Sequence, residues 1–134
     1  MQDLYLTGDR LRITSRPDNP TKVFIGENVS LTWSYYQPSH VTLSKVVFGI
    51  SVAVNKIEPK LVTVNGSNGF PDVNEDYKPI VSWAGNLTAY LAVFVLHDVQ
   101  LKDGNKFFGI TFDVGLLYNN IRNRVQLQVQ AKRK

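Results

Sequence analysis

The alternation of apolar and polar residues is the feature that most constrains what this chain can fold into. Val29, Leu31 and Trp33 alternate with polar neighbours, and this two-residue period is typical of a half-buried β-strand. Similar short segments recur between clusters of Gly, Pro, Asn and Asp. We predict strands at 10–14, 23–25, 28–34, 43–54, 60–65, 80–83, 88–96, 106–114 and 124–130. No segment combines helical spacing with caps, so the sequence predicts an all-β protein.

Strands at this spacing favour a two-sheet sandwich, although a barrel satisfies the same pattern. The 134 residues suit one domain, residues 1–134, with a core over about 9–130 and a basic tail or linker start at 131–134. Because 43% of residues are apolar and only 19% are charged, composition excludes a disordered chain.

The charge and the apolar runs limit the partners. Five of the 15 Lys and Arg residues fall within 122–134, so the net charge of +4 is partly an end effect and we expect no nucleic-acid partner. The longest apolar run, 89–96, has eight residues against the ~20 that a membrane-spanning helix needs. We therefore expect membrane attachment only through a region outside these residues.

The chain has no cysteine, which excludes disulfides, thiolate metal sites and a cysteine nucleophile. It has three Asn-x-Ser/Thr acceptor triplets, at Asn28, Asn65 and Asn86, which are candidate glycosylation sites. Chance predicts about one such triplet in a chain of this composition. The mild excess favours an extracellular protein.

Two separate segments carry a resemblance to a known family. Residues 26–33, GENVSLTW, resemble the G-E-x-V-x-L-x-C segment of variable-type immunoglobulin domains, and 94–109 are similar to their L-x-I-x-x-V-x-x-x-D-x-G-x-Y-x-C block. Residues 125–129 resemble the closing strand. The resemblance implies an immunoglobulin-like two-sheet β-sandwich of the V-set type. Asp103 then matches the family aspartate, Phe107 the tyrosine-corner residue and Gly109 the second cysteine.

The departures from this family predict an unusual core. Trp33 stands at the first cysteine position, so the inter-sheet disulfide is absent. We predict that the Trp33 indole lies over Gly109, since this pair conserves volume across the sandwich. Phe48 is expected to replace the tryptophan of the third strand. The predicted structural residues are Trp33, Phe48, Asp103, Phe107 and Gly109.

The cysteine-free sequence resembles the V-set-like ectodomains of colonial hydroid allorecognition receptors. This resemblance implies an extracellular domain of a cell-surface transmembrane receptor. It also implies homophilic binding in trans to the same receptor, through the sheet face of the family's C, F and G strands.

The resemblance also sets the side-chain directions on the strand at 106–114. If Phe107 and Gly109 point inward, then Phe108, Ile110 and Phe112 point outward and form an adhesive face. Gln126 and Gln128 on the next strand would add its polar contacts. The alternative is that the loop at 115–123 folds back over the three apolar side chains.

Aromatic residues in loops suggest further binding sites. Tyr35 and Tyr36 are expected in the first recognition loop and Tyr118 in the last, either as binding or as loop-packing residues. A different class of function is a carbohydrate- or other ligand-binding module, with Trp83, Tyr90 and these tyrosines as its platform. A spacer domain that binds nothing is a third possibility.

The sequence does not favour an enzyme. The only histidines, His40 and His97, are far apart, and no nucleophile elbow, zinc-binding helix or phosphate loop occurs. The acidic residues at 72–76 do not have the spacing of a calcium loop and predict a solvated turn. We therefore expect no catalytic residues, no metal and no cofactor.

Overall fold

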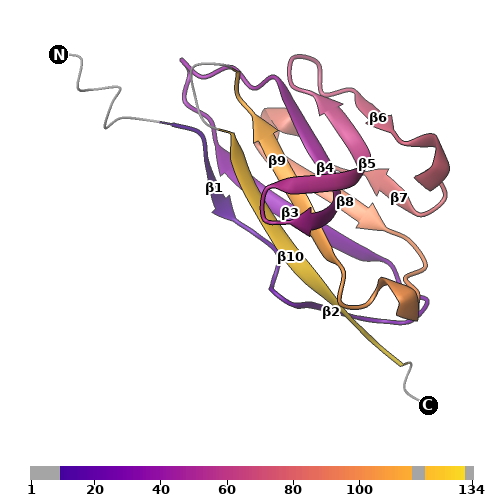
Figure 1. Ribbon diagram of the computed structural model, residues 1–134. Helices are drawn as coiled ribbons and strands as arrows, with labels where there is room; N and C mark the ends of the chain where they lie inside the picture. The colour runs from indigo at the N-terminus through magenta and orange to yellow at the C-terminus, as the bar shows by residue number, and fades with distance from the viewer. Residues whose placement is uncertain (1–9, 116–119, 132–134) are drawn as a thin grey trace.

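A computed structural model describes residues 10–115 and 120–131 of the chain (Figure 1). The described residues form ten strands and three short 3-10 helices, with no α-helix among them. The strands are β1 (Arg12–Ser15), β2 (Thr21–Phe24), β3 (Val29–Tyr36), β4 (Lys45–Ala53), β5 (Lys56–Asn65), β6 (Pro71–Val73), β7 (Val81–Trp83), β8 (Leu91–Leu96), β9 (Phe107–Asp113) and β10 (Ile121–Gln130). The 3-10 helices are η1 (Glu75–Tyr77), η2 (Leu87–Ala89) and η3 (Leu101–Asp103).

The strands are arranged in two packed sheets. One has four strands in the order β1-β3-β8-β7, and the other has six in the order β2-β10-β9-β4-β5-β6. All neighbours are antiparallel except β2, which runs parallel to β10. This arrangement of two packed, mainly antiparallel sheets is consistent with an immunoglobulin-like β-sandwich. The predicted sandwich without a disulfide is confirmed.

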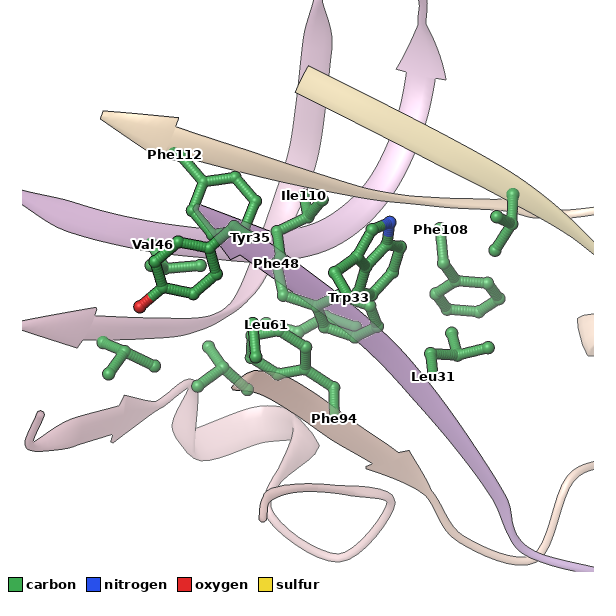
Figure 2. Packing of buried hydrophobic residues seen from close by; sticks show 14 of the residues in the cluster. Leu31, Trp33, Tyr35, Val46, Phe48, Leu61, Phe94, Phe108, Ile110 and Phe112 are labelled. Atoms are coloured by element: carbon green, nitrogen blue, oxygen red, sulfur yellow. The ribbon is translucent and has the colours of Figure 1, made fainter. Parts of the chain in front are cut away.

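Apolar side chains from both sheets form the core. In β3 the predicted alternation buries Leu31 and Trp33 and continues to Tyr35, while the residues between them face outward or lie half-buried. Figure 2 shows Trp33 at the centre of the cluster, among aromatic rings from both sheets. Its ring lies 6.1 Å from Phe48 and 6.3 Å from Phe94, and those two rings stack at 4.3 Å. Trp33 and Phe48 are therefore core residues, as predicted.

Some predicted strand boundaries are wrong. The segment 88–96 is not one strand, because η2 precedes β8 and Tyr90 between them has a left-handed backbone. The segment 66–78, in which no strand is predicted, contains β6 and η1. Strand β5 begins at Lys56, four residues earlier than predicted.

The predicted side-chain directions on β9 are also wrong. Phe108 and Ile110 point into the core, whereas Phe107 and Gly109 face the outer side of the six-stranded sheet. The first inward aromatic, Phe108, lies five positions after Asp103, against four positions in the family pattern. A shift of one residue moves every side chain of a strand to the opposite face.

The same shift changes the partner of Trp33. Its indole does not lie over Gly109, because the two residues are on opposite sides of the six-stranded sheet. Instead, Trp33 Nε1 donates a hydrogen bond of 2.8 Å to Asn123 Oδ1 on β10. This bond satisfies the only polar atom of a fully buried side chain and links the two sheets.

Asp103 has a structural role but is not in the core. One carboxylate oxygen accepts a hydrogen bond of 2.9 Å from the Gln100 backbone N–H, which caps η3. The other lies 3.6 Å from Lys106 Nζ. Asp103 therefore fixes the turn that leads into β9.

Candidate binding surfaces

The predicted adhesive residues of β9 belong to the core. Phe108, Ile110 and Phe112 are 4%, 1% and 0% exposed. They face the interior between the two sheets, so the opposite sheet covers them rather than a folded-back loop. Residues 116–119 of that loop lie outside the described part of the chain.

The outer face of the six-stranded sheet has a different composition from the one predicted. Phe107 lies half-buried on it, and the guanidinium of Arg124 lies 4.2 Å from the centre of its ring. Gln126 and Gln128 also face outward, because the alternate residues Val125 and Leu127 are buried. The two glutamines are therefore the part of the predicted adhesive face that lies at the surface.

The end of β4 and the start of β5 curl out of the sheet as a hairpin (Figure 1). Two glycines, Gly49 and Gly109, face each other across β4 and β9 and let this hairpin lie close to the sheet. A Cβ on Gly49 would lie 2.5 Å from Ile57 Cγ2, and one on Gly109 would lie 3.1 Å from Ser51 Cβ. The hairpin therefore occupies the space that side chains at these positions would fill.

The tip of this hairpin exposes two apolar residues. Val52 is 57% exposed and Val54 is 75% exposed. Ser51 and Ile57 at the base of the hairpin lie over Gly109, whose partner on β10 is Arg124, so the hairpin leaves the sheet on its outward side at β9. We call this surface the hairpin face; it comprises Val52, Val54, Phe107, Arg124, Gln126 and Gln128.

A groove lies at the end of the sandwich where β3 ends and β8 begins. It has a volume of about 470 Å³ and lies between the turn after β3, the turn after β5 and the β7–β8 connection. We call it the loop-end groove. Its lining residues are Gln37, Pro38, Ser39, Leu43, Gly66, Ser67, Asn68, Gly69, Trp83, Gly85, Asn86, Leu87, Thr88 and Tyr90. None of them carries a charge.

Two aromatic side chains give this groove its shape. The half-buried Trp83 ring packs 5.1 Å from Phe94 and against Gly85, where a Cβ would lie 2.7 Å from Trp83 Cζ2. Tyr90 is 46% exposed and adopts φ 60° and ψ 40°, a conformation that a bulky side chain rarely takes. Trp83 and Tyr90 were predicted to form one platform, and they do line the same groove.

The structure places none of the three tyrosines expected in recognition loops in a described loop. Tyr35 and Tyr36 belong to β3, and Tyr118 lies outside the described residues. Tyr35 is buried, with its hydroxyl donating to the Leu87 carbonyl at 3.4 Å and its ring 5.7 Å from Tyr90. Burial, with a smaller contribution from Tyr90, raises the pKa of Tyr35 to about 12. Tyr36 lies under the guanidinium of Arg12 at 4.5 Å.

All three acceptor asparagines are exposed, in two kinds of setting. Asn65 Oδ1 and Asn86 Oδ1 each accept hydrogen bonds from the backbone and the hydroxyl of the residue two positions later. Asn28 Oδ1 instead accepts from the distant Asp98 backbone N–H at 3.0 Å. Only Asn86 lines the loop-end groove.

Other polar clusters are accounted for by local structure. Asn74, within the acidic segment 72–76, caps η1 and also donates to the Lys60 carbonyl. Ser82 Oγ on β7 lies 2.8 Å from Nε2 of His97, the residue that follows β8. Within 10–115 and 120–131 no group of three or more His, Cys, Asp and Glu is arranged to hold a metal. No helix in these ranges has the length and apolarity to cross a membrane.

Two comparisons with known proteins find no match for this sequence. No family model matches the sequence, and a search of curated proteins finds no significant match. The functional argument therefore depends on the two surfaces described above.

Proposed function

We propose that this chain is an extracellular recognition domain of a cell-surface receptor, and that it binds a second copy of itself in trans through the hairpin face. The exposed valines at the tip of the β4–β5 hairpin carry this proposal. Apolar side chains exposed next to each other on a soluble domain are typical of a protein-binding surface. The role is one of binding, without catalysis or a cofactor.

The size of the sheet supports a protein partner. Strand β10 has ten residues, which at ~3.3 Å per residue gives a length of about 33 Å. Five neighbouring strands at ~4.8 Å spacing give a width of about 20 Å. The resulting area of about 650 Å² approaches the ~800 Å² per partner of a standard interface.

The chemistry of the hairpin face supports pairing with an identical copy. The side-chain amides of Gln126 and Gln128 both donate and accept hydrogen bonds, so each can pair with the same residue of a second copy. In a two-fold arrangement every contact occurs twice, and the valines of one copy can pack on those of the other.

The acceptor asparagines lie away from the hairpin face. Asn65 is at the far end of β5 from the hairpin tip, Asn86 lines the loop-end groove, and Asn28 contacts the turn after β8. Glycans at these positions would leave the hairpin face open. This arrangement suits a glycosylated receptor that binds protein through its sheet.

Aggregation of protein-coated beads is the test, because multivalent display detects interactions too weak to measure between single domains. We expect beads coated with the wild-type chain to aggregate. Val52→Asp/Val54→Asp should remain folded and abolish aggregation, because each copy would bring two charges into an apolar contact. Phe70→Asp is the matched control: Phe70 is 72% exposed but lies in the β5–β6 turn, so aggregation should persist.

Two results would contradict the proposal. Wild-type beads that stay dispersed would exclude homophilic binding. Equal loss of aggregation in Phe70→Asp would place the contact at the other end of the domain. Sedimentation at increasing concentration would supply the dissociation constant where binding is strong enough.

A ligand-binding module for neutral sugars is the second candidate, favoured by Trp83 and Tyr90 in the uncharged loop-end groove. It predicts a monomer whose tryptophan fluorescence changes on titration with saccharides. Homophilic binding predicts instead a signal that depends on protein concentration alone.

A further inference from the structure

The loop-end groove has a chemistry that restricts its occupant. Fourteen residues line about 470 Å³, and none carries a charge, although 19% of the residues in the whole chain are charged. An anionic or cationic ligand would have no charged partner there. Amides, hydroxyls and two aromatic rings suit a neutral molecule with both hydroxyl groups and an apolar face, as a sugar ring has.

Asn86 brings such a molecule to the groove by a covalent route. It begins the acceptor triplet Asn86-Leu87-Thr88 and lies exposed on the groove lining. Its Oδ1 accepts from the Thr88 backbone N–H at 3.0 Å and from Thr88 Oγ1 at 2.7 Å. Among the described residues, the Asn86 amide nitrogen has no hydrogen-bond partner and is available for modification.

Trp83 precedes this asparagine by three residues in the same connection. Gly85 between them has no side chain, and the indole occupies the space beside its backbone. The half-buried ring therefore lies on the same groove lining as the Asn86 amide. A sugar attached to Asn86 would have an aromatic surface beside it at a high effective concentration.

We propose that the loop-end groove is the site of this chain's own N-linked glycan, with the first N-acetylglucosamine on Asn86 packed against Trp83. This inference rests on the extracellular location proposed above. The Asn86 amide nitrogen forms a bond to the anomeric carbon of a lipid-diphosphate-linked oligosaccharide. The bond from that carbon to the diphosphate oxygen breaks, the amide loses one proton, and the lipid diphosphate leaves.

The other two acceptor asparagines provide the contrast. Asn65 has the same turn geometry as Asn86, with Ser67 N–H at 2.8 Å and Ser67 Oγ at 2.7 Å, but it does not line the groove. Asn28 is engaged by Asp98, and its Ser30 lies within β3. Asn65→Gln is therefore the matched control for Asn86→Gln.

Tryptophan quenching by acrylamide tests the contact on protein secreted from eukaryotic cells, after mass spectrometry has measured the occupancy of each acceptor asparagine. The chain has two tryptophans, and Trp33 is fully buried, so quenching reports on Trp83. We expect the quenching constant to be about twofold lower in wild type than in Asn86→Gln, since a sugar would cover the exposed part of the half-buried ring. Asn65→Gln should behave like wild type.

Three results would overturn this inference. Asn86 could be unmodified in the secreted protein, or it could be modified with no difference in quenching from Asn86→Gln. Alternatively, free chitobiose could protect Trp83 in Asn86→Gln at micromolar concentration, which would assign the groove to a sugar on another molecule. None of these results changes bead aggregation, so the homophilic proposal is tested separately.

Discussion

The hairpin face and the loop-end groove both depend on glycine, but with opposite results. At the hairpin face, Gly49 and Gly109 admit a backbone hairpin that fills the space and presents two valines to solvent. In the groove, Gly85 admits the Trp83 ring, and the three surrounding turns leave the space beside it open.

The difference in shape and charge predicts a difference in ligand. The hairpin face is broad and combines apolar side chains with Arg124 and two amides, which suits a protein surface. The groove is hollow and uncharged, which suits a small neutral group. Changes on one surface are therefore expected to leave binding at the other intact.

Phe112→Ala should have the largest effect and tests which side of β9 is the interior. Phe112 is fully buried and its ring lies 4.8 Å from Tyr35. Its truncation should lower the free energy of unfolding by about 3–5 kcal/mol. Phe107→Ala on the outer side of the same strand should cost only about 1 kcal/mol. Urea denaturation measures both, and equal losses would contradict the observed register.

Gly49→Ala should have the next largest effect and tests how the hairpin is seated. The added methyl would meet Ile57 and the Pro59 backbone, so the hairpin must move. We expect a loss of about 1–3 kcal/mol in the free energy of unfolding, as for other overpacked sites. Gly109→Ala should cost less, because its nearest neighbour, Ser51 Cβ, would lie 3.1 Å away. The same loss in both variants would argue against a backbone clash at Gly49.

The alternation in β3 was sufficient to predict the fold class and much of the core. Its apolar residues face inward as expected, and the position of Phe48 also follows from its apolar strand. Such patterns are local, so they survive without any knowledge of the neighbouring strands.

The register of β9 was assigned from the family resemblance, and this assignment was wrong. The strand's own alternation points the other way, because the polar Thr111 and Asp113 alternate with the buried Ile110 and Phe112. Only the first part of the strand, where Phe107 and Phe108 are adjacent, is ambiguous. The family pattern was counted from Asp103, and one additional residue in the turn inverted it.

The two surfaces could not be predicted from local patterns, because both are formed by contacts between segments that are distant in the sequence. Glycine within a strand indicates a close approach of other chain segments, and Gly49 and Gly109 carried that signal. The sequence did not indicate that the two face each other or that the hairpin covers them. Trp83 and Tyr90 were chosen as aromatic candidates, but the groove depends on three turns that are distant in the sequence.

Tyr35 connects the groove to an effect of pH. Its folded-state pKa is about 12, against about 10 when unfolded, so the folded protein retains this proton to higher pH. The contribution of Tyr35 to the free energy of unfolding is fully present below pH 10. It is lost as the pH rises from about 10 to about 12, which lowers the free energy of unfolding by up to about 2 kcal/mol. Tyr35→Phe should remove this part of the decline. Denaturation between pH 9 and pH 12 would show it, and an unchanged slope would exclude Tyr35 as its source.

Lys56→Ala should have the smallest effect and separates charge from apolar contact at the hairpin face. Lys56 Nζ lies 3.3 Å from Glu58 Oε1, but both side chains are largely exposed. Such a pair contributes little to stability, so the free energy of unfolding should change by less than about 0.5 kcal/mol.

Bead aggregation should also persist in Lys56→Ala, because the valines at the tip remain. Raising the salt concentration should likewise leave aggregation largely unchanged, since screening weakens exposed ion pairs and not apolar contacts. If Lys56→Ala or high salt abolished aggregation while Val52→Asp/Val54→Asp retained it, the partner would be recognised by charge. The contact between copies would then be formed by charged side chains, and not by the valines of the hairpin tip.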